Sequence, residues 1–414
     1  MAEEMLNNIL DWCIENTDIL QAKDHFHGKT FLHFVSEKGY APVVDKLLGR
    51  GVEIDSKDFS EGTSLHLVSK IGHTKVARLL IQNGATVNSR NGEDETPLHL
   101  ASKNGKLEVA KLLVERGGDI NTQTGANANK TGSQQTPLHY ASHKGHLEIA
   151  KLLLQNGADV NICRLPNKST PLMLASEKGH DKVVKLLLEN GANVDVKNRN
   201  DATPLHYSAQ NGHFKTAEML LQNGAKVDCQ LNKNKFTPLH ATSTKGHLEI
   251  TKLLILNGAN VNCTTSENQT PLHLACQYGH LEISKILLEN NACLTLKNKA
   301  GKMALEIAKE KKHKRIYRII YEKMISALST SENLTQNVEE HREIKRIISH
   351  NFEFEYSPEQ KNCIVCYEPR NGTFVLQPCG HAKTCETCSL KIVEESKICP
   401  MCRSHVSKYQ KIYD

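Results

Sequence analysis

The segment "TPLHYASHKGHLEIAKLLLQNGADVN", residues 136–161, contains the start and stop signals of two short helices. Thr136 is a good helix cap, and Pro137 takes the first helical position, where its missing N–H costs no hydrogen bond. Gly145 ends this helix in the left-handed backbone region that glycine adopts freely. The apolar residues of "LEIAKLLL" recur at the helical period, and "NGA" stops the second helix. The segment therefore predicts a helix pair with one apolar face.

Near copies of this segment recur through about three quarters of the chain. The motif Thr-Pro-Leu-His or a variant returns every 33 or 34 residues, with one interval of 40, at Thr30, Thr63, Thr96, Thr136, Thr170, Thr203, Thr237, Thr270 and, in degenerate form, Met303. A single helix pair cannot bury its own apolar face, so consecutive pairs must stack. The pattern resembles the ankyrin family. The resemblance implies a mainly α fold, an ankyrin-repeat solenoid of about nine repeats with terminal capping helices.

The repeat pattern also divides the chain into domains. We expect an N-terminal capping helix over residues 1–27, repeats over 28–325, a flexible linker over 326–360 and a small C-terminal domain with its tail over 361–414. The expected repeats are approximately 28–57, 61–90, 94–123, 134–163, 168–197, 201–230, 235–264, 268–297 and 301–325. The polar stretch 124–135 accounts for the long interval as a lengthened loop.

Thirteen of the 21 histidines follow the repeat period. They could be mistaken for metal ligands or proton carriers, but catalysis does not need one copy in every repeat. We interpret them as structural residues that form hydrogen bonds within each repeat. They are His33, His66, His99, His139, His206, His240 and His273 in the motif, and His73, His146, His180, His213, His247 and His280 after glycine.

A dense set of metal-ligand residues follows the repeats. The order is Cys363-x2-Cys366-x12-Cys379-x-His381-x3-Cys385-x2-Cys388-x10-Cys399-x2-Cys402. Eight such ligands make two tetrahedral sets of four, which is the pattern of structural zinc. Because no ligand is spare, neither ion keeps an open position for catalysis. A domain of about 50 residues has too small a core to fold without such support.

This C3HC4 order resembles the RING family. The resemblance implies that two interleaved zinc ions are bound, the first by Cys363, Cys366, Cys385 and Cys388, and the second by Cys379, His381, Cys399 and Cys402. It also implies activity as a RING-type E3 ubiquitin ligase, which has no nucleophile of its own and holds a ubiquitin-charged conjugating enzyme. By the same resemblance Val365, Ile392 and Pro400 would dock that enzyme, and Arg403 would bridge enzyme and ubiquitin with its planar guanidinium.

The short tail after Cys402 resembles the inhibitor-of-apoptosis type of RING. That resemblance implies a RING-mediated homodimer in which Tyr413 contacts ubiquitin across the dimer. The substrate would be an unidentified protein bound by the repeats. The turns "KNRND" (197–201) and "LNKNKF" (231–236) are candidate contacts. The alternative is a non-enzymatic scaffold, in which the RING only dimerises the chain and the repeats tether a partner.

Composition excludes several other classes. No stretch of about 18 apolar residues is present, so we expect no membrane span, and the acidic start "MAEEMLNNILDW" does not fit a secretory signal. Scattered cysteines and a spaced cluster fit a reducing compartment, so we expect a cytoplasmic protein. The net charge of +6 is too mild to favour nucleic acid. The basic run Lys309–Arg315, "KEKKHKR", is an alternative signal for nuclear import and the sole support for a nucleic-acid regulator.

Overall fold

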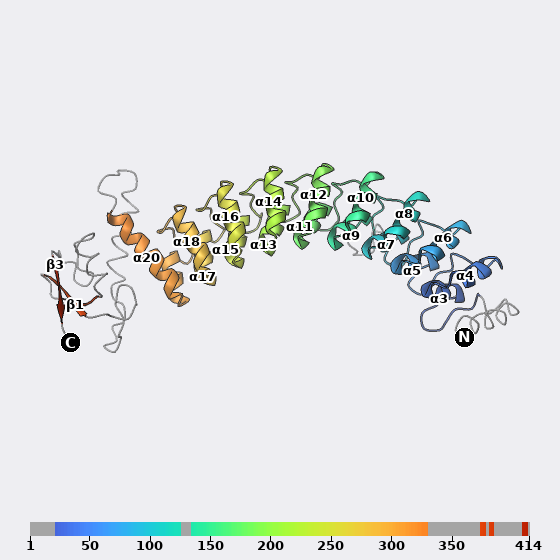
Figure 1. Cartoon of the computed structure of the whole chain (residues 1–414), viewed down its shortest axis with the longest axis horizontal. Coiled ribbons are helices and arrows are strands. Elements are labelled where there is room, and N and C mark those ends of the chain that lie inside the picture. The colour runs from blue at the N-terminus through green and yellow to red at the C-terminus, as the bar shows by residue number, and fades with distance from the viewer. Residues whose placement is uncertain (1–20, 126–133, 330–372, 378–380, 385–407, 413–414) are drawn as a thin grey trace. The chain divides into compact units, whose positions relative to one another are not determined.

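The computed structural model describes residues 21–125, 134–329, 373–377, 381–384 and 408–412. The chain divides into two compact units, Met1–Ala259 and Asn260–Asp414. Among the described residues, the first unit consists of paired helices and their connections, and the second contains further helix pairs and three short strands (Figure 1). The mainly α fold that the repeats predict is confirmed.

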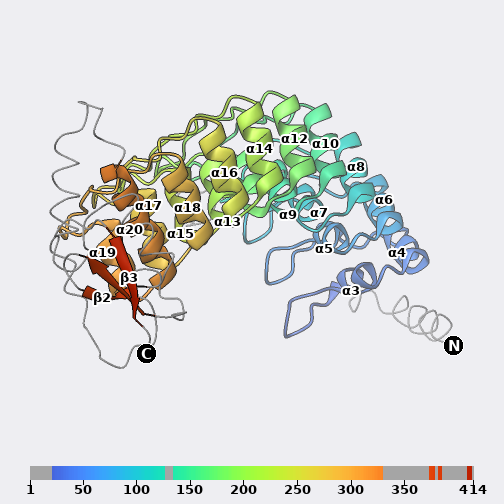
Figure 2. The same ribbon diagram turned by 60° about the vertical axis from the view of Figure 1, so that its left-hand side comes forward.

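The helix pairs of the first unit lie in two rows (Figure 1). The first helices of the pairs are α3 (Phe31–Lys38), α5 (Ser64–Ile71), α7 (Pro97–Lys103), α9 (Pro137–Lys144), α11 (Pro171–Lys178), α13 (Pro204–Asn211) and α15 (Pro238–Lys245). The second helices are α4 (Ala41–Leu48), α6 (Thr74–Gln82), α8 (Leu107–Glu115), α10 (Leu147–Gln155), α12 (Asp181–Glu189), α14 (Phe214–Gln222) and α16 (Leu248–Leu256). The connecting loops project to one side of the helices (Figure 2).

Helices α9 and α10 illustrate why each pair has these bounds. The backbone N–H of His139 donates to the Thr136 hydroxyl at 3.4 Å, and the backbone N–H of Thr136 donates to Nδ1 of His139 at 3.2 Å. Gly145 ends α9 with φ 75°, as the sequence predicts. Asn156 caps α10, and Gly157 follows with φ 87°. The start and stop residues of the repeated segment therefore act as expected.

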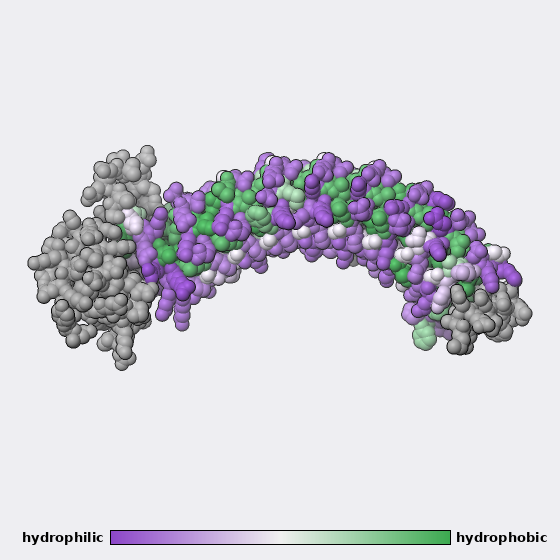
Figure 3. Space-filling model, viewed as in Figure 1, coloured by the Kyte–Doolittle hydropathy of each residue, from purple (hydrophilic) through white to green (hydrophobic). Residues whose placement is uncertain are grey.

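The core lies between the two rows of helices. Leu138 of α9 and Leu153 of α10 are fully buried, and so is Ala141. Helix α9 packs against α7 and α11, while α10 packs against α8 and α12. Burial of one leucine side chain stabilises the fold by about 1.5–3 kcal/mol, and every helix pair buries several apolar side chains. The surface in Figure 3 is largely hydrophilic, with hydrophobic residues visible between polar ones.

Hydrogen bonds connect the two ends of the lengthened loop between the third and fourth repeats. The backbone N–H of Thr124 donates to the Gln135 carbonyl at 3.0 Å, and the N–H of Gln135 donates to the Thr124 hydroxyl at 3.1 Å. Residues 126–133 lie outside the described part of the chain. The insertion therefore extends one turn and leaves the helices on either side in register.

The second unit begins with two helix pairs. They are α17 (Pro271–Tyr278) with α18 (Leu281–Glu289), and α19 (Ala304–Glu310) with α20 (Lys314–Ser329). In the degenerate ninth motif, Glu306 replaces the histidine, and its carboxylate accepts the backbone N–H of Met303 at 2.8 Å. Helix α20 continues past residue 325, where we expected the repeats to end.

Helix α20 has the amphipathic character expected of a terminal cap. Ile316, Ile320 and Met324 are buried, whereas Lys314 and Arg315 are exposed. The basic run Lys309–Arg315 spans the end of α19, the turn and the start of α20. None of the helices over residues 21–125 and 134–329 has the length and hydrophobicity that a membrane span requires.

The predicted N-terminal helix falls mainly outside the described residues, which begin at Gln21. Gln21 is helical, but residues 22–24 have no regular structure and residues 25–27 form a turn, so the helix does not extend to residue 27 as predicted. The Asp24 carboxylate accepts the backbone N–H of His27 and of Lys29 in this turn. Most of the expected linker, residues 330–360, also lies outside the described part.

Candidate functional site: the zinc-ligand segment and the repeat surface

Three antiparallel strands run through the zinc-ligand segment. They are β1 (Thr373–Gln377), β2 (His381–Thr384) and β3 (Lys408–Ile412), in the order β2-β1-β3. Leu376 of β1 lies opposite His381 of β2 and, on the other edge, opposite Tyr409 of β3. The pairing of β1 with β2 shifts register between Phe374 and Val375.

One residue of the predicted ligand set lies in the described strands. His381 is the first residue of β2 and pairs with Leu376 of β1. The seven cysteine ligands lie outside the described residues: Cys363, Cys366, Cys379, Cys385, Cys388, Cys399 and Cys402. The candidate enzyme contacts Val365, Ile392, Pro400, Arg403 and Tyr413 lie outside them as well.

The donor chemistry of this segment suits zinc. Seven thiolates and one imidazole form two sets of four borderline-soft ligands, which tetrahedral zinc prefers. Elsewhere, the described residues contain no group of three histidine, cysteine or acidic side chains that could hold a metal ion. The scattered cysteines of the repeats, such as buried Cys276 and exposed Cys163, are free thiols. The segment after the repeats is thus where a metal fits.

Strand β3 was not anticipated from the sequence. We treated the tail after Cys402 only as the carrier of Tyr413. Instead, residues 408–412 pair with the whole of β1, from Thr373 opposite Ile412 to Gln377 opposite Lys408. Its sequence, "KYQKI", has little apolar alternation, so it carries no strong strand signal. Residues 408–412 of the tail are therefore part of the sheet.

The motif histidines join each repeat to the next. Because Nδ1 of each ring accepts the backbone N–H of the capping threonine, Nε2 must carry the ring proton and donate. The Nε2 donors and their acceptor carbonyls are His33 and Gly62 at 3.1 Å, His66 and Glu95 at 3.0 Å, His99 and Gln135 at 3.0 Å, His139 and Ser169 at 3.1 Å, and His206 and Phe236 at 3.1 Å. Nε2 of His99 also lies 2.9 Å from the Thr122 carbonyl of its own repeat. In the second unit, His273 donates to the Lys302 carbonyl at 3.1 Å. The predicted structural role is confirmed, but these bonds are not confined to one repeat.

Burial keeps these rings neutral. Removal from water lowers the pKa of His99 and of His206 to about 4 and that of His139 to about 3, although hydrogen bonds to backbone carbonyls oppose the shift. A neutral ring can accept at Nδ1 and donate at Nε2 at once, whereas a protonated ring cannot accept. The observed geometry and the lowered pKa values are therefore consistent.

The histidines after glycine connect each repeat to the preceding one. Nε2 of His180 lies 3.1 Å from the His143 carbonyl, and Nε2 of His213 lies 3.0 Å from the Glu177 carbonyl. The ring of His180 covers Gly145 so closely that a Cβ there would lie 2.6 Å from Nδ1. Gly145 is therefore required both by its positive φ and by the ring against it.

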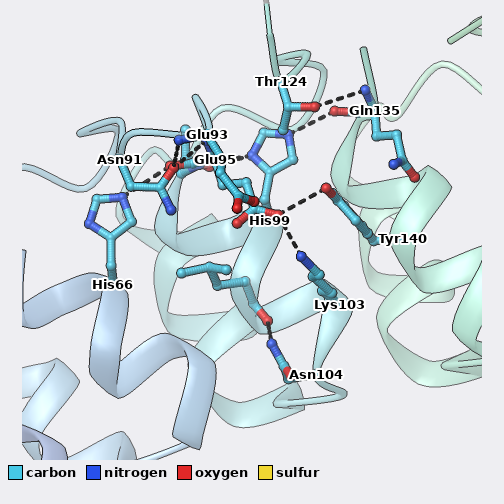
Figure 4. A network of polar contacts seen from close by, with 12 residues as sticks. His66, Asn91, Glu93, Glu95, His99, Lys103, Asn104, Thr124, Gln135 and Tyr140 are labelled. Carbon is cyan, nitrogen blue, oxygen red and sulfur yellow. Dashed lines mark hydrogen bonds and ion pairs between the residues drawn. The ribbon is translucent and has the colours of Figure 1, made fainter. Parts of the chain in front are cut away.

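A half-buried ion pair of the third repeat contacts the fourth repeat through Tyr140 (Figure 4). The Glu95 carboxylate accepts Nζ of Lys103 at 2.9 Å and the Tyr140 hydroxyl at 2.9 Å. Burial alone would raise the pKa of Glu95, but these two hydrogen bonds lower it overall. Burial and the nearby Glu95 charge raise the pKa of Tyr140. Each of the three side chains has a hydrogen-bond partner within the cluster. The cluster therefore has a structural role, because it links α7 to α9.

A turn that we call the tip precedes the threonine of each motif. In the sixth repeat the tip is residues 197–202, closed by the backbone N–H of Asn198 donating to the Ala202 carbonyl at 3.1 Å. The residue two before the threonine has positive φ in most repeats, although Gln134 of the fourth repeat does not. It is Gly28 in the first repeat, and Glu61, Asp94, Lys168, Asp201 and Lys235 take the same conformation with φ between 55° and 59°. Side chains other than glycine, asparagine and aspartate are disfavoured there.

Comparison with known families agrees with these observations. The family model "Ankyrin repeats (3 copies)" matches residues 32–124, 162–230, 191–265 and 239–331, and the model "Ankyrin repeat" matches residues 133–164. The model "Zinc finger, C3HC4 type (RING finger)" matches residues 359–409.

Two characterised proteins are similar to short stretches of the chain. A putative apoptosis inhibitor, ORF106 of Ostreid herpesvirus 1 (isolate France), is 40% identical over 60 residues, which is 14% of this chain and 13% of the relative. The E3 ubiquitin-protein ligase APD2 of Arabidopsis thaliana is 38% identical over 52 residues, or 13% of this chain and 12% of the relative. The similarity thus spans about an eighth of each relative. From the paired helices, the repeated motif and the family matches, the chain belongs to the ankyrin-repeat family and carries a C-terminal C3HC4 RING finger.

Proposed function

We propose that this protein is a RING-type E3 ubiquitin-protein ligase. The observation that carries the proposal is the C3HC4 RING match over residues 359–409. By resemblance to RING ligases, Pro400 and Arg403 would contact the conjugating enzyme. The similarity to a relative named as an E3 ubiquitin-protein ligase supports it. In this proposal the ankyrin repeats bind the substrate protein, and the RING recruits the ubiquitin-charged conjugating enzyme.

The chemistry would take place on the bound partners. A lysine amine of the substrate attacks the thioester carbonyl of ubiquitin, the new amide bond forms, and the conjugating enzyme leaves as its thiol. The chain would contribute position and charge, because a fixed geometry turns a bimolecular step into an effectively unimolecular one. Zinc, held by the eight predicted ligands, would hold the RING loops in place.

The docking residues and the activating residue have separate roles in this scheme. Val365, Ile392 and Pro400 would supply the apolar contact to the conjugating enzyme. Arg403 would donate hydrogen bonds to both the enzyme and ubiquitin, since its five donors lie in one plane. If these bonds form only in the activated complex, they increase the rate of transfer without tightening the initial binding.

A reconstituted ubiquitin reaction tests the proposal. Purified chain, ubiquitin-activating enzyme and a panel of conjugating enzymes should give ubiquitin transfer to the chain itself. Val365→Ala should weaken enzyme binding, whereas Arg403→Ala should slow thioester discharge roughly tenfold or more, because hydrogen bonds to charged groups contribute about 1.5–3 kcal/mol. Arg370→Ala, at an arginine of the same segment to which we assign no role, is the matched control.

The alternative is a scaffold in which the repeats tether a partner and the RING only dimerises the chain. Wild-type protein that retains its zinc but transfers no ubiquitin with any conjugating enzyme would favour this alternative. Dimerisation through the RING, with Tyr413 reaching ubiquitin on the partner subunit, is itself part of our proposal. We propose action in the cytoplasm, with the exposed basic residues of Lys309–Arg315 as the alternative signal for nuclear import.

A further inference from the structure

Three neighbouring tips in the first unit form a positively charged surface. These are residues 164–169, 197–202 and 231–236, which we call the basic tips. Asp201 is the single acidic residue in them. The exposed basic side chains are Lys168, Lys197, Arg199, Lys233 and Lys235.

The positive charges of the basic tips are not neutralised within the described part of the chain. None of the five exposed side chains forms an ion pair there. Earlier repeats differ, since Lys57 pairs with Glu61 at 3.7 Å and Lys29 pairs with Glu37 at 2.7 Å. Five basic groups held close together with a single carboxylate, Asp201, repel one another, so a bound anion would stabilise this surface.

The backbone of two basic tips holds a lysine in the left-handed region. Lys168 and Lys235 have φ of 56° and 55°, a region that costs a lysine about 1–2 kcal/mol. In the first repeat Gly28 occupies the same position without that cost. Glu61 of the second repeat takes the same conformation with φ 57°, so the conformation is a property of the tip. In two of the three basic tips, the residue at this position is a lysine.

Hydrogen bonds fix the spacing of the basic tips. The backbone N–H of Arg199 donates to the Asn167 carbonyl at 3.0 Å, and the N–H of Asn232 donates to the Asn200 carbonyl at 3.1 Å. The amide of Asn232 also donates to the Arg199 carbonyl at 2.8 Å. Neighbouring packed helices lie about 8–10 Å apart, so successive tips are separated by about 10 Å. An extended peptide covers that distance in about three residues.

This spacing and charge favour a protein segment over nucleic acid. Surfaces that bind single-stranded nucleic acid place exposed aromatic rings among their basic groups. Phe236 is the only aromatic residue of the basic tips, and its half-buried ring lies 5.3 Å from the ring of His240. We propose that the basic tips bind an extended acidic protein segment with carboxylates about three residues apart. That this segment belongs to a ubiquitination substrate rests on the function proposed above, whereas the binding itself does not.

The test uses the full-length chain and synthetic peptides. The probe is a fluorescent peptide of four Glu-Ser-Gly repeats, and binding is measured by fluorescence anisotropy at low and high salt. Its controls are the same peptide with Gln for Glu, and a peptide of equal composition with the four Glu residues adjacent. We expect the spaced peptide to bind at least several-fold more tightly than either control, with affinity that falls as salt increases.

Matched variants locate the binding surface. The triple variant Arg199→Glu, Lys233→Glu and Lys235→Glu should weaken peptide binding at least tenfold. The control, Lys151→Glu, Lys182→Glu and Lys215→Glu, makes the same change in net charge with exposed lysines of the second helices and should leave binding unchanged. Circular dichroism checks that both variants keep their helices.

Several outcomes would overturn the inference. They are equal losses in the two variants, equal binding of the Glu and Gln peptides, or tighter binding of a single-stranded oligonucleotide to the same tips. Self-ubiquitination is measured on the same samples. Peptide binding without ubiquitin transfer would refute the proposed function and leave this inference standing, whereas transfer without peptide binding would refute this inference alone.

Discussion

Replacing His139 by methionine should make the stability of the fourth repeat less dependent on pH. The fifth repeat already carries buried Met173 at the same motif position, so methionine fits this site. At pH 7 the variant loses the bond from Nε2 to the Ser169 carbonyl and the acceptor for the Thr136 N–H. The wild-type repeat should therefore be the more stable of the two at neutral pH.

The pKa of His139 sets the size of the effect. The pKa is about 3 in the folded chain, against 6.5 for an ordinary histidine. Between these values the unfolded chain binds a proton that the folded chain does not, so the free energy of unfolding falls as the pH decreases from 6.5 towards 3. Each pH unit in that window is worth about 1.4 kcal/mol, so the advantage of wild type should shrink by about 2 kcal/mol between pH 7 and pH 5.

Amide hydrogen exchange is the suitable assay, because a repeat array opens locally as well as globally. The free energy of opening of residues 136–161 is compared between wild type and His139→Met at both pH values, after correction for intrinsic exchange. Met173→Leu changes a buried residue without a titrating group and should give the same difference at both pH values. A difference between wild type and His139→Met that stays constant from pH 7 to pH 5 would refute the assignment of this pH dependence to His139.

Three further predictions concern the RING, one tip and the tail. Elemental analysis should find two zinc ions per chain, and Cys379→Ser should lose the second ion while the helical circular dichroism signal persists; fewer than two ions in wild type would contradict the ligand assignment. Asp94→Gly should raise the free energy of unfolding in urea by about 1 kcal/mol, because one carboxylate oxygen of Asp94 is buried without a hydrogen bond to the described residues and glycine adopts φ 59° as readily as aspartate; a destabilised variant would show that the side chain is needed. Tyr413→Ala should reduce ubiquitin transfer and leave zinc content intact, whereas deletion of residues 408–414 should also reduce zinc retention because it removes β3; a deletion variant with full zinc content would mean that β3 is dispensable.

Much of the array could be predicted from sequence because its determinants are local. Thr136, Pro137 and Gly145 specify the bounds of one helix within ten residues, and the same signals recur in every repeat. The end of the array was harder to predict, since α20 keeps its helical character through "MISALS" without a stop signal and reaches Ser329.

Contacts between repeats could not be predicted from such local sequence signals. The Glu95 carboxylate and the Tyr140 hydroxyl are 45 residues apart in sequence, and neither residue type indicates a buried pair. The motif histidines are structural, as predicted, but the sequence of one repeat does not identify the carbonyl that accepts from Nε2, because that carbonyl lies next to the following repeat. Strand β3 was missed for a related reason, because a five-residue polar strand is defined by its partner β1 and hardly by its own composition.

Met173 has a mechanical consequence for the array. The motif histidines on either side, His139 and His206, each bond to a carbonyl of the following repeat, whereas a thioether side chain has no ring nitrogen to donate. Consecutive repeats under tension behave as springs in series, and extension concentrates at the softest joint. Under tension the joint between the fifth and sixth repeats would therefore extend more than an otherwise equal joint that keeps the histidine bond, although His213 and Thr216 still connect these two repeats.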